Sequence, residues 1–111
     1  FWGKFWLLVP VVDALIPETF ENMIFQNFPN PFNPSTTIEF TVSRESPVEL
    51  HVFNVNGEKV KTLVDGNKGA GRYNIVWDGT DNYGRDVSSG VYFYRLSIAD
   101  YKSTKKMLML K

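Results

Sequence analysis

Turn signals that lead directly into alternating β-rich runs recur along the chain after residue 27. Four phrases carry the pattern, and they are FPNPFNPSTTIEF from Phe28, WDGTDNYG from Trp77, SGVYFYRL from Ser89 and KMLMLK ending at Lys111. Within each run, apolar and polar residues alternate with the period of a β-strand, whereas no helical periodicity follows Asn27. The sequence therefore predicts an all-β domain.

The strands can be located from the same alternation. Clusters of Gly, Pro, Asn and Asp separate short runs of alternating apolar and polar residues, as expected for strands joined by turns. The expected strands cover residues 38–42, 48–53, 58–65, 73–77, 91–99 and 103–110, with 85–87 as a candidate seventh. Six or seven short strands of this kind predict an antiparallel β-sandwich.

Local chemistry predicts the connections between the strands. Asn56-Gly57 is typical of a type I′ hairpin turn, in which both central residues have positive φ. In the run that follows, the alternation slips between Val60 and Leu63, which indicates a bulge or a sheet edge. Glycines at both ends of residues 66–71 predict a flexible loop there.

Two prolines shape the approach to the first predicted strand. Pro31 and Pro34 cannot donate to a β-ladder, and they push the preceding asparagines out of the helical region. We therefore expect an extended segment at a sheet margin, with Phe32 as its apolar anchor. A proline-rich docking ligand is the alternative interpretation of this spacing.

Residues 1–26 form an apolar N-terminal extension that differs from the β-rich part, residues 27–111. Lys4, Pro10 and Asp13 interrupt its apolar stretch, which is shorter than the ~20 residues of a membrane span. The chain starts at Phe1 and carries no evident cleavage site, so we expect a processed protein or a fragment.

The extension is expected to lie against a partner protein or a membrane surface, and not to complete the β-core. Its apolar residues are too numerous to leave in water, and the predicted strands already have apolar faces of their own. Packing on the sandwich itself is a further interpretation of this segment. The candidate docking residues are Phe1, Trp2, Phe5, Trp6, Leu7 and Leu8.

Composition argues against several classes of function. The chain has 111 residues, enough for one ordinary domain, and its net charge is zero, which argues against nucleic-acid binding. It contains no cysteine, and its one histidine, His51, falls on the polar face of its predicted strand. No catalytic or cofactor-binding residues can be proposed from this sequence, and we expect a protein that is not an enzyme.

The turn after Trp77 is the segment most suited to binding an ion. Asp78, Asp81 and Asn82 supply oxygen atoms of the kind that Ca²⁺ prefers, although their spacing is not that of a calcium-binding loop. These residue types also accept hydrogen bonds from their own backbone in turns, which explains them without a metal.

The aromatic residues allow two interpretations. Tyr73, Trp77, Tyr92, Phe93 and Tyr94 are candidates for a sugar-stacking platform, or for the core of a small domain. Alternation places Phe93 on the opposite face of its strand from its two tyrosine neighbours, so one of these faces belongs to the core. Trp77 is expected to be a core anchor.

The four phrases together resemble the type A C-terminal sorting domain of proteins exported by the type IX secretion system. The NPFNPST segment, the W-D-G-x-D-x-x-G turn, the S-G-x-Y-x-Y strand and the final KMLMLK occur in the family's order. The resemblance implies an immunoglobulin-like sandwich akin to that of flagellar hook-cap proteins. It also implies a sorting signal in Lys106, Met107, Leu108, Met109, Leu110 and Lys111.

The resemblance implies a non-catalytic domain that a translocon reads, so that its carrier crosses the outer membrane and is attached to the surface or released. The expected location is the periplasm, the outer membrane, the cell surface or the medium. The alternative function is a retained structural or interaction subunit of a larger extracytoplasmic or membrane-associated complex, docked through residues 1–16.

Overall fold

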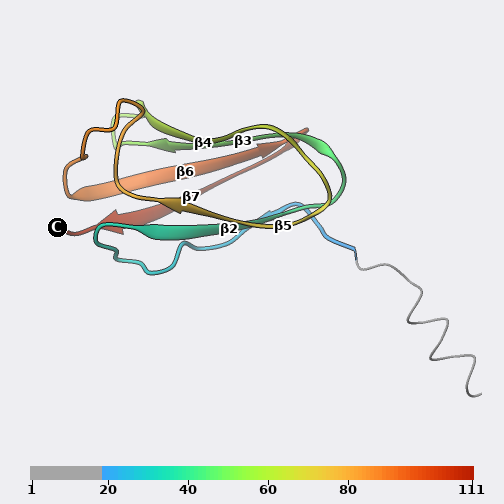
Figure 1. Ribbon diagram of the computed structural model, residues 1–111, viewed down its shortest axis with the longest axis horizontal. Helices are drawn as coiled ribbons and strands as arrows, with labels where there is room; N and C mark the ends of the chain where they lie inside the picture. The colour runs from blue at the N-terminus through green and yellow to red at the C-terminus, as the bar shows by residue number, and fades with distance from the viewer. Residues whose placement is uncertain (1–18) are drawn as a thin grey trace, which may run out of the picture.

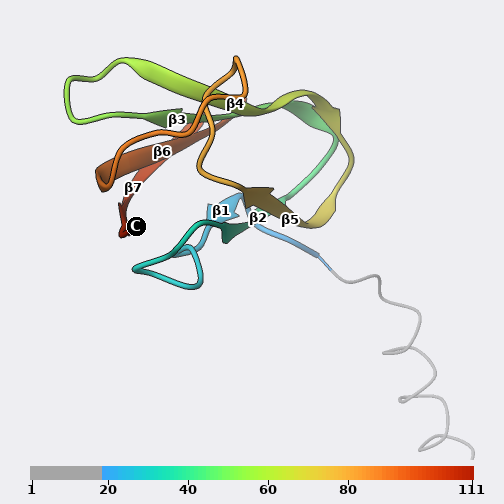
Figure 2. The same cartoon turned by 60° about the vertical axis from the view of Figure 1, so that its left-hand side comes forward.

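The computed structural model describes residues 19–111 as two antiparallel sheets packed face to face (Figures 1 and 2). One sheet has the order β1-β2-β5 and the other has the order β4-β3-β6-β7. The strands are β1 (Met23–Ile24), β2 (Thr36–Val42), β3 (Ser46–Phe53), β4 (Lys59–Lys68), β5 (Gly71–Trp77), β6 (Gly90–Ile98) and β7 (Tyr101–Met109). The part of the chain described contains no helix, and the predicted sandwich is confirmed.

The core lies between the sheets and is built by alternation. On β3, Val48, Leu50 and Val52 are fully buried, and on β6 every second residue from Tyr92 to Ile98 points the same way. Burying one large apolar side chain contributes ~1.5–3 kcal/mol, so these inward faces supply most of the driving force. The apolar pattern that predicted the strands therefore also identified their inner faces.

Trp77, at the end of β5, is the predicted core anchor and is fully buried. Its ring lies 5.4 Å from that of Tyr92 in an edge-on contact and 5.7 Å from that of Phe32. Its indole Nε1 donates to the carbonyl oxygen of Thr80 at 2.9 Å, which satisfies the one polar group of the side chain. The anchor thus joins the core to the turn that follows β5.

The hairpin between β3 and β4 is confirmed, but its predicted turn type is wrong. Gly57 has a φ of 80°, whereas Asn56 is not in the left-handed region that a type I′ turn requires. The Asn54 carboxamide oxygen accepts hydrogen bonds from the backbone N–H groups of Asn56 and Glu58, at 2.9 and 3.0 Å. This side chain stabilises the turn from its start, so one left-handed residue is sufficient.

The slipped alternation of the third run is explained by the position of β4. This strand is an edge of the four-stranded sheet, and its pairing with β3 shifts register between Leu50 and His51 and again between Val52 and Phe53. The expected bulge and the expected edge are therefore both present.

Two expectations about the loops are wrong. Residues 66–71 are not a flexible loop, because Gly66 and its neighbours continue β4 by pairing with the start of β3, and β5 begins at Gly71. The candidate strand at 85–87 is reduced to one bridge, between Thr80 and Asp86. Pairing with distant segments determines whether each of these stretches forms a strand, and the local sequence does not show that pairing.

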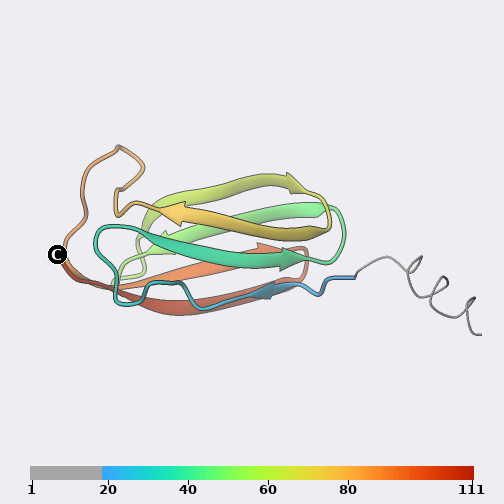
Figure 3. The same cartoon turned by 60° about the horizontal axis from the view of Figure 1, so that its bottom comes forward.

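The sandwich includes residues that precede position 27. Ile24 in β1 pairs with Phe40 in β2 and is only 5% exposed, so it belongs to the core. After β1, the chain follows the edge of β2 through the bridge between Phe28 and Thr37. Figures 1 and 3 show that this stretch leads to the end of the sandwich at which the C-terminus lies.

Candidate functional site

The strand β7 carries most of the predicted sorting residues, and the fold divides them into two groups. Met107 and Met109 point into the core and are each 1% exposed. Lys106 and Leu108 alternate with them and face outward, and Leu110 and Lys111 follow the end of the strand. The two methionines are thus part of the hydrophobic core, and the other four residues are accessible on the surface.

The proline segment, residues 28–36, covers the outer edge of β7. The N–H of Phe32 donates to the carbonyl oxygen of Leu108 at 3.0 Å, and the N–H of Leu110 donates to the carbonyl oxygen of Phe32 at 3.0 Å. The Asn30 carboxamide oxygen accepts from the N–H of Leu108, also at 3.0 Å. This confirms a sheet-margin position for the segment and shows which strand it protects.

The turn after Trp77 meets the same end of β7. A Cβ built on Gly79 would lie 2.5 Å from Met109 Cε and 3.0 Å from the carbonyl oxygen of Pro34. On the other side, the N–H of Lys111 donates to Ser89 Oγ at 3.0 Å. The first three sequence phrases therefore converge on the fourth, at the end of β7.

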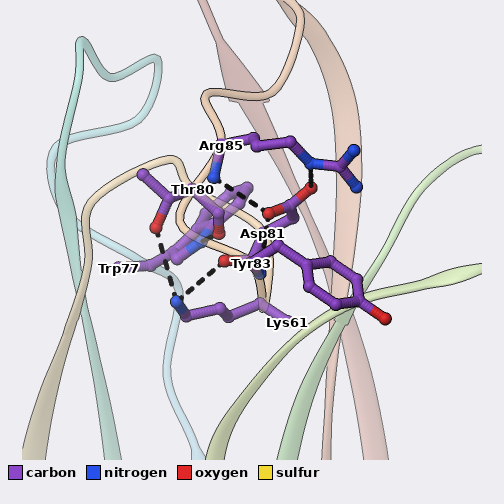
Figure 4. Close-up of polar contacts among 6 residues, drawn as sticks. All are labelled: Lys61, Trp77, Thr80, Asp81, Tyr83 and Arg85. Carbon is purple, nitrogen blue, oxygen red and sulfur yellow. Dashed lines mark hydrogen bonds and ion pairs between the residues drawn. The ribbon is translucent and has the colours of Figure 1, made fainter.

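Two of the candidate metal ligands, Asp78 and Asp81, accept hydrogen bonds within their turn, and Figure 4 shows those that Asp81 accepts from Arg85. Asp78 Oδ1 accepts from the N–H and the hydroxyl of Thr80, and these bonds lower the pKa of the Asp78 carboxyl. Asp81 Oδ1 accepts from the N–H groups of Tyr83 and Arg85, while its Oδ2 accepts from Arg85 Nε at 3.0 Å. The backbone bond from Arg85 is the main cause of the lowered pKa of Asp81.

Asn82, the third candidate, has its hydrogen-bond partner outside the turn. Its carboxamide oxygen accepts from the N–H of Thr62 on β4 at 3.0 Å, so it ties the turn to a sheet edge. Within residues 19–111, no group of three or more His, Cys, Asp or Glu side chains is placed to hold a metal. Turn and edge stabilisation accounts for all three residues.

A polar groove of about 700 Å³ lies between this turn and the β3–β4 hairpin. Asp81, which lines the groove, accepts a hydrogen bond at its carbonyl oxygen from Lys61 Nζ at 3.1 Å (Figure 4). Tyr83 is 83% exposed, and the Arg85 guanidinium carbon lies 5.1 Å from its ring centre. Most of the polar side chains that line the groove already form hydrogen bonds within the protein. These bonds stabilise the turn and leave few polar groups to bind a ligand.

His51 is not the surface residue that its strand position predicted. It is 9% exposed, and its ring nitrogens lie 2.9 Å from Glu49 Oε1 and 3.1 Å from Thr62 Oγ1. The ring of Phe53 covers it from one side, with the ring centres 6.3 Å apart. The bond to His51 is the main cause of the lowered pKa of Glu49. Neighbouring side chains on the outward face bury the imidazole, which the alternation did not show.

The aromatic residues divide as their alternation indicated. Tyr92 and Tyr94 lie in the core, whereas Phe93 faces outward and is half-buried. The Tyr94 hydroxyl donates to the carbonyl oxygen of Phe25 and accepts from the N–H of Asn27, both at 2.8 Å. Burial raises the pKa of Tyr94 to about 12. These tyrosines are structural, so no sugar-stacking platform forms from the proposed set.

The six candidate docking residues, from Phe1 to Leu8, lie outside the described residues. Among those that are described, no helix has the length and apolar character needed to cross a membrane.

Two residues at the end of β7 were not predicted from the sequence. They are Asn30, whose side chain accepts a hydrogen bond from β7, and Gly79, whose lack of a side chain lets the turn approach Met109. Only the motif phrases that contain these residues pointed to them.

Three solved structures share the fold of this chain. Dimeric latent PorU from Porphyromonas gingivalis matches with a TM-score of 0.65 and 21% identity, over 86% of this chain and 10% of that one. PorZ, described as an essential surface component of the type-IX secretion system of the same organism, gives a TM-score of 0.54 and 14% identity over 81% and 11%. FlgD from Xanthomonas campestris, described in connection with the hook capping that is essential for flagellar assembly, gives a TM-score of 0.55 and 22% identity over 90% and 72%.

At these identities, the likeness shows the fold alone. The chain spans about a tenth of the length of PorU and PorZ. No curated protein matches its sequence. The sequence does match the family description "FlgD Ig-like domain" over residues 32–102, which is more than half of the 111 residues. The chain therefore belongs to the FlgD Ig-like domain family.

Proposed function

We propose that this sandwich is a non-catalytic sorting domain, read by the type IX secretion machinery, that directs its carrier across the outer membrane for attachment to the surface. One observation carries the proposal, namely the convergence of three family-like phrases on the fourth, which forms the end of the final strand. Phe32, Gly79 and Ser89 each contact the segment from Leu108 to Lys111. The likeness of the fold to PorZ, which is described as a bacterial surface component, supports an extracytoplasmic role. The protein would work in the periplasm, at the outer membrane or outside the cell.

A terminal strand that several segments hold is suited to presenting a signal. The buried Met107 and Met109 fix the strand in the core, so the residues that alternate with them are presented in one orientation. Lys106, Leu110 and Lys111 are all exposed there. We propose that these exposed residues are read by the translocon, while the methionines only position them.

The test places the full chain at the C-terminus of a periplasmic reporter in a bacterium with a type IX system. The parent fusion should reach the cell surface, and deletion of residues 106–111 should leave the reporter in the periplasm. Because that deletion also removes core residues, a second variant changes only Lys106, Leu110 and Lys111 to serine. It should fold and fail to be exported.

Substitution of Met107 and Met109 by leucine is the matched control, because it preserves the apolar core and leaves the outward residues intact. This control should be exported like the parent. Export of the triple serine variant at the parent level, measured by surface labelling of intact cells, would contradict a sorting role for these residues.

The second candidate function is a retained subunit of a larger assembly, docked through Phe1, Trp2, Phe5, Trp6, Leu7 and Leu8. Its support is membership of a family named after FlgD, together with the likeness to the FlgD structure, which is described in connection with the hook capping essential for flagellar assembly. The mass of the mature protein in its native fraction separates the two candidates. A domain that is retained favours the subunit, and one that is cleaved off favours sorting.

A further inference from the structure

The outward face of the four-stranded sheet carries an apolar strip between basic side chains. Phe53 on β3 pairs with Phe93 on β6, and Phe93 pairs with Lys106 on β7. Two residues along the same pair of strands, Val91 of β6 pairs with Leu108 of β7. Residues paired in this way share a face, so the four apolar side chains form one continuous strip.

Positive charge borders this strip on both sides. On one side of the strip, Lys59 of β4 pairs with Phe53, and on the other side the exposed Lys106 of β7 pairs with Phe93. The guanidinium carbon of Arg95 lies 4.7 Å from the ring centre of Phe53, which holds this exposed cation beside the apolar surface. The neighbouring carboxylate, Glu49, is engaged with His51 at 2.9 Å.

The strip is not explained by the packing of the domain. The core side chains of β3 and β6 lie on the opposite faces of these strands, and Phe53, Val91, Phe93 and Leu108 all remain half-buried. A depression of about 290 Å³ opens between Phe53, Phe93 and Arg95, and its wall includes Val55, which is 67% exposed. An apolar strip with a concave part and fixed cations has the composition of an interaction surface.

The chemistry of the strip specifies its partner. Aromatic and arginine side chains are the residue types that most often dominate binding energy at the centre of protein interfaces. Basic side chains on both borders favour a partner that carries carboxylates beside an apolar ridge, because opposite charges steer association and fix its orientation.

We propose that the surface formed by Phe53, Val91, Phe93, Arg95, Lys106 and Leu108 docks an acidic protein partner that has an exposed apolar ridge. The inference rests on the proposed function, since it takes this partner to be a component of the export or attachment machinery. It adds that recognition extends from the terminal strand to β3 and β6, which carry none of the predicted sorting residues.

The test uses the full-chain reporter fusion with the double substitution Phe93→Ser and Arg95→Glu. The matched control is Val76→Ser with Arg72→Glu, on β5 of the other sheet, where Val76 is 61% exposed and Arg72 makes a surface ion pair with Glu39 at 3.1 Å. Export of the Phe93/Arg95 variant should fall ~tenfold or more, as for the loss of a dominant interface residue. The control should be exported like the parent.

Thermal melting of both variants establishes whether they fold. If the Phe93/Arg95 variant does not fold, Arg95→Glu is tested alone, since this side chain is exposed and is not one of the predicted sorting residues. Parent-level export of a folded variant of this surface would overturn the inference and leave the proposed function standing. A parent fusion that stays in the periplasm, while the host exports its own substrates, would instead overturn the proposed function and with it the inference.

Photocrosslinking identifies the class of partner. Benzoylphenylalanine at position 93 of the fusion should crosslink to a protein with an acidic contact region, whereas the same group at position 76 should not. Crosslinks from position 93 to lipid or polysaccharide alone would overturn the assignment of a protein partner.

Discussion

The N–H of Phe32 donates to the carbonyl oxygen of Leu108 at 3.0 Å, and this bond joins the segment before β2 to the last strand of the chain. The Phe32 ring is 2% exposed and contacts the ring of Trp77, so the same residue links the edge of β7 to the core. Any signal carried by the final residues therefore depends on a segment near the start of the sandwich.

Substituting Phe32 by alanine should destabilise the domain strongly. Removing a buried aromatic side chain typically costs ~3–5 kcal/mol, and here the loss also loosens the edge of β7. Phe28→Ala is the matched control, because Phe28 lies in the same segment and is 80% exposed. Urea unfolding monitored by tryptophan fluorescence measures both. Similar midpoints for the two variants would contradict the role assigned to Phe32.

Gly79→Ala should be more destabilising than Gly84→Ala. Both glycines have nearly the same left-handed φ, 79° and 80°, so the backbone strain of ~1–2 kcal/mol is common to both substitutions. Only at Gly79 would the new Cβ meet Met109 and the carbonyl oxygen of Pro34, whereas nothing lies within 4 Å at Gly84. Thermal melts of the two variants measure the difference. Equal losses would show that the turn does not pack closely on β7.

Truncation should locate the N-terminal limit of the fold. A chain that begins at Thr19 should keep the melting temperature of the full chain, because it retains β1. A chain that begins at Gln26 should melt at a lower temperature, since it lacks Ile24, whose removal from the core costs ~2–5 kcal/mol in related cases. Equal melting temperatures for the two truncated chains would show that β1 contributes little.

Acid should weaken the turn at Asp81. Hydrogen bonds from Arg85 and Tyr83 hold the folded-state pKa of Asp81 below the usual range of an aspartate. Its stabilising contribution is therefore complete above the unfolded pKa of about 3.9 and is lost as the pH falls through the folded pKa. Asp81→Asn should consequently lower the melting temperature at pH 7 more than at pH 2. An equal effect at both pH values would contradict the importance of the ionised carboxylate.

Local sequence was sufficient to predict strands β2 to β7 and most of their inner faces, but not β1. The alternation at Val48, Leu50 and Val52 has the period of a strand, and all three side chains are fully buried. Trp77 and the hairpin after β3 follow from equally local patterns. Such features depend on residue spacing and turn chemistry within a few positions, so no knowledge of the fold is needed to predict them.

Only the tertiary structure determined which residues from distant parts of the sequence lie next to each other. His51 is buried because Phe53 and the shifted register of β4 place neighbours over it, and residues 66–68 stay in a strand because β3 pairs with them. The contact between Phe32 and Leu108, and the alignment of Phe53 with Phe93, likewise join segments that are distant in sequence. Alternation specifies the two faces of each strand, but only the pairing of strands determines which side chains share a face and which edge is covered.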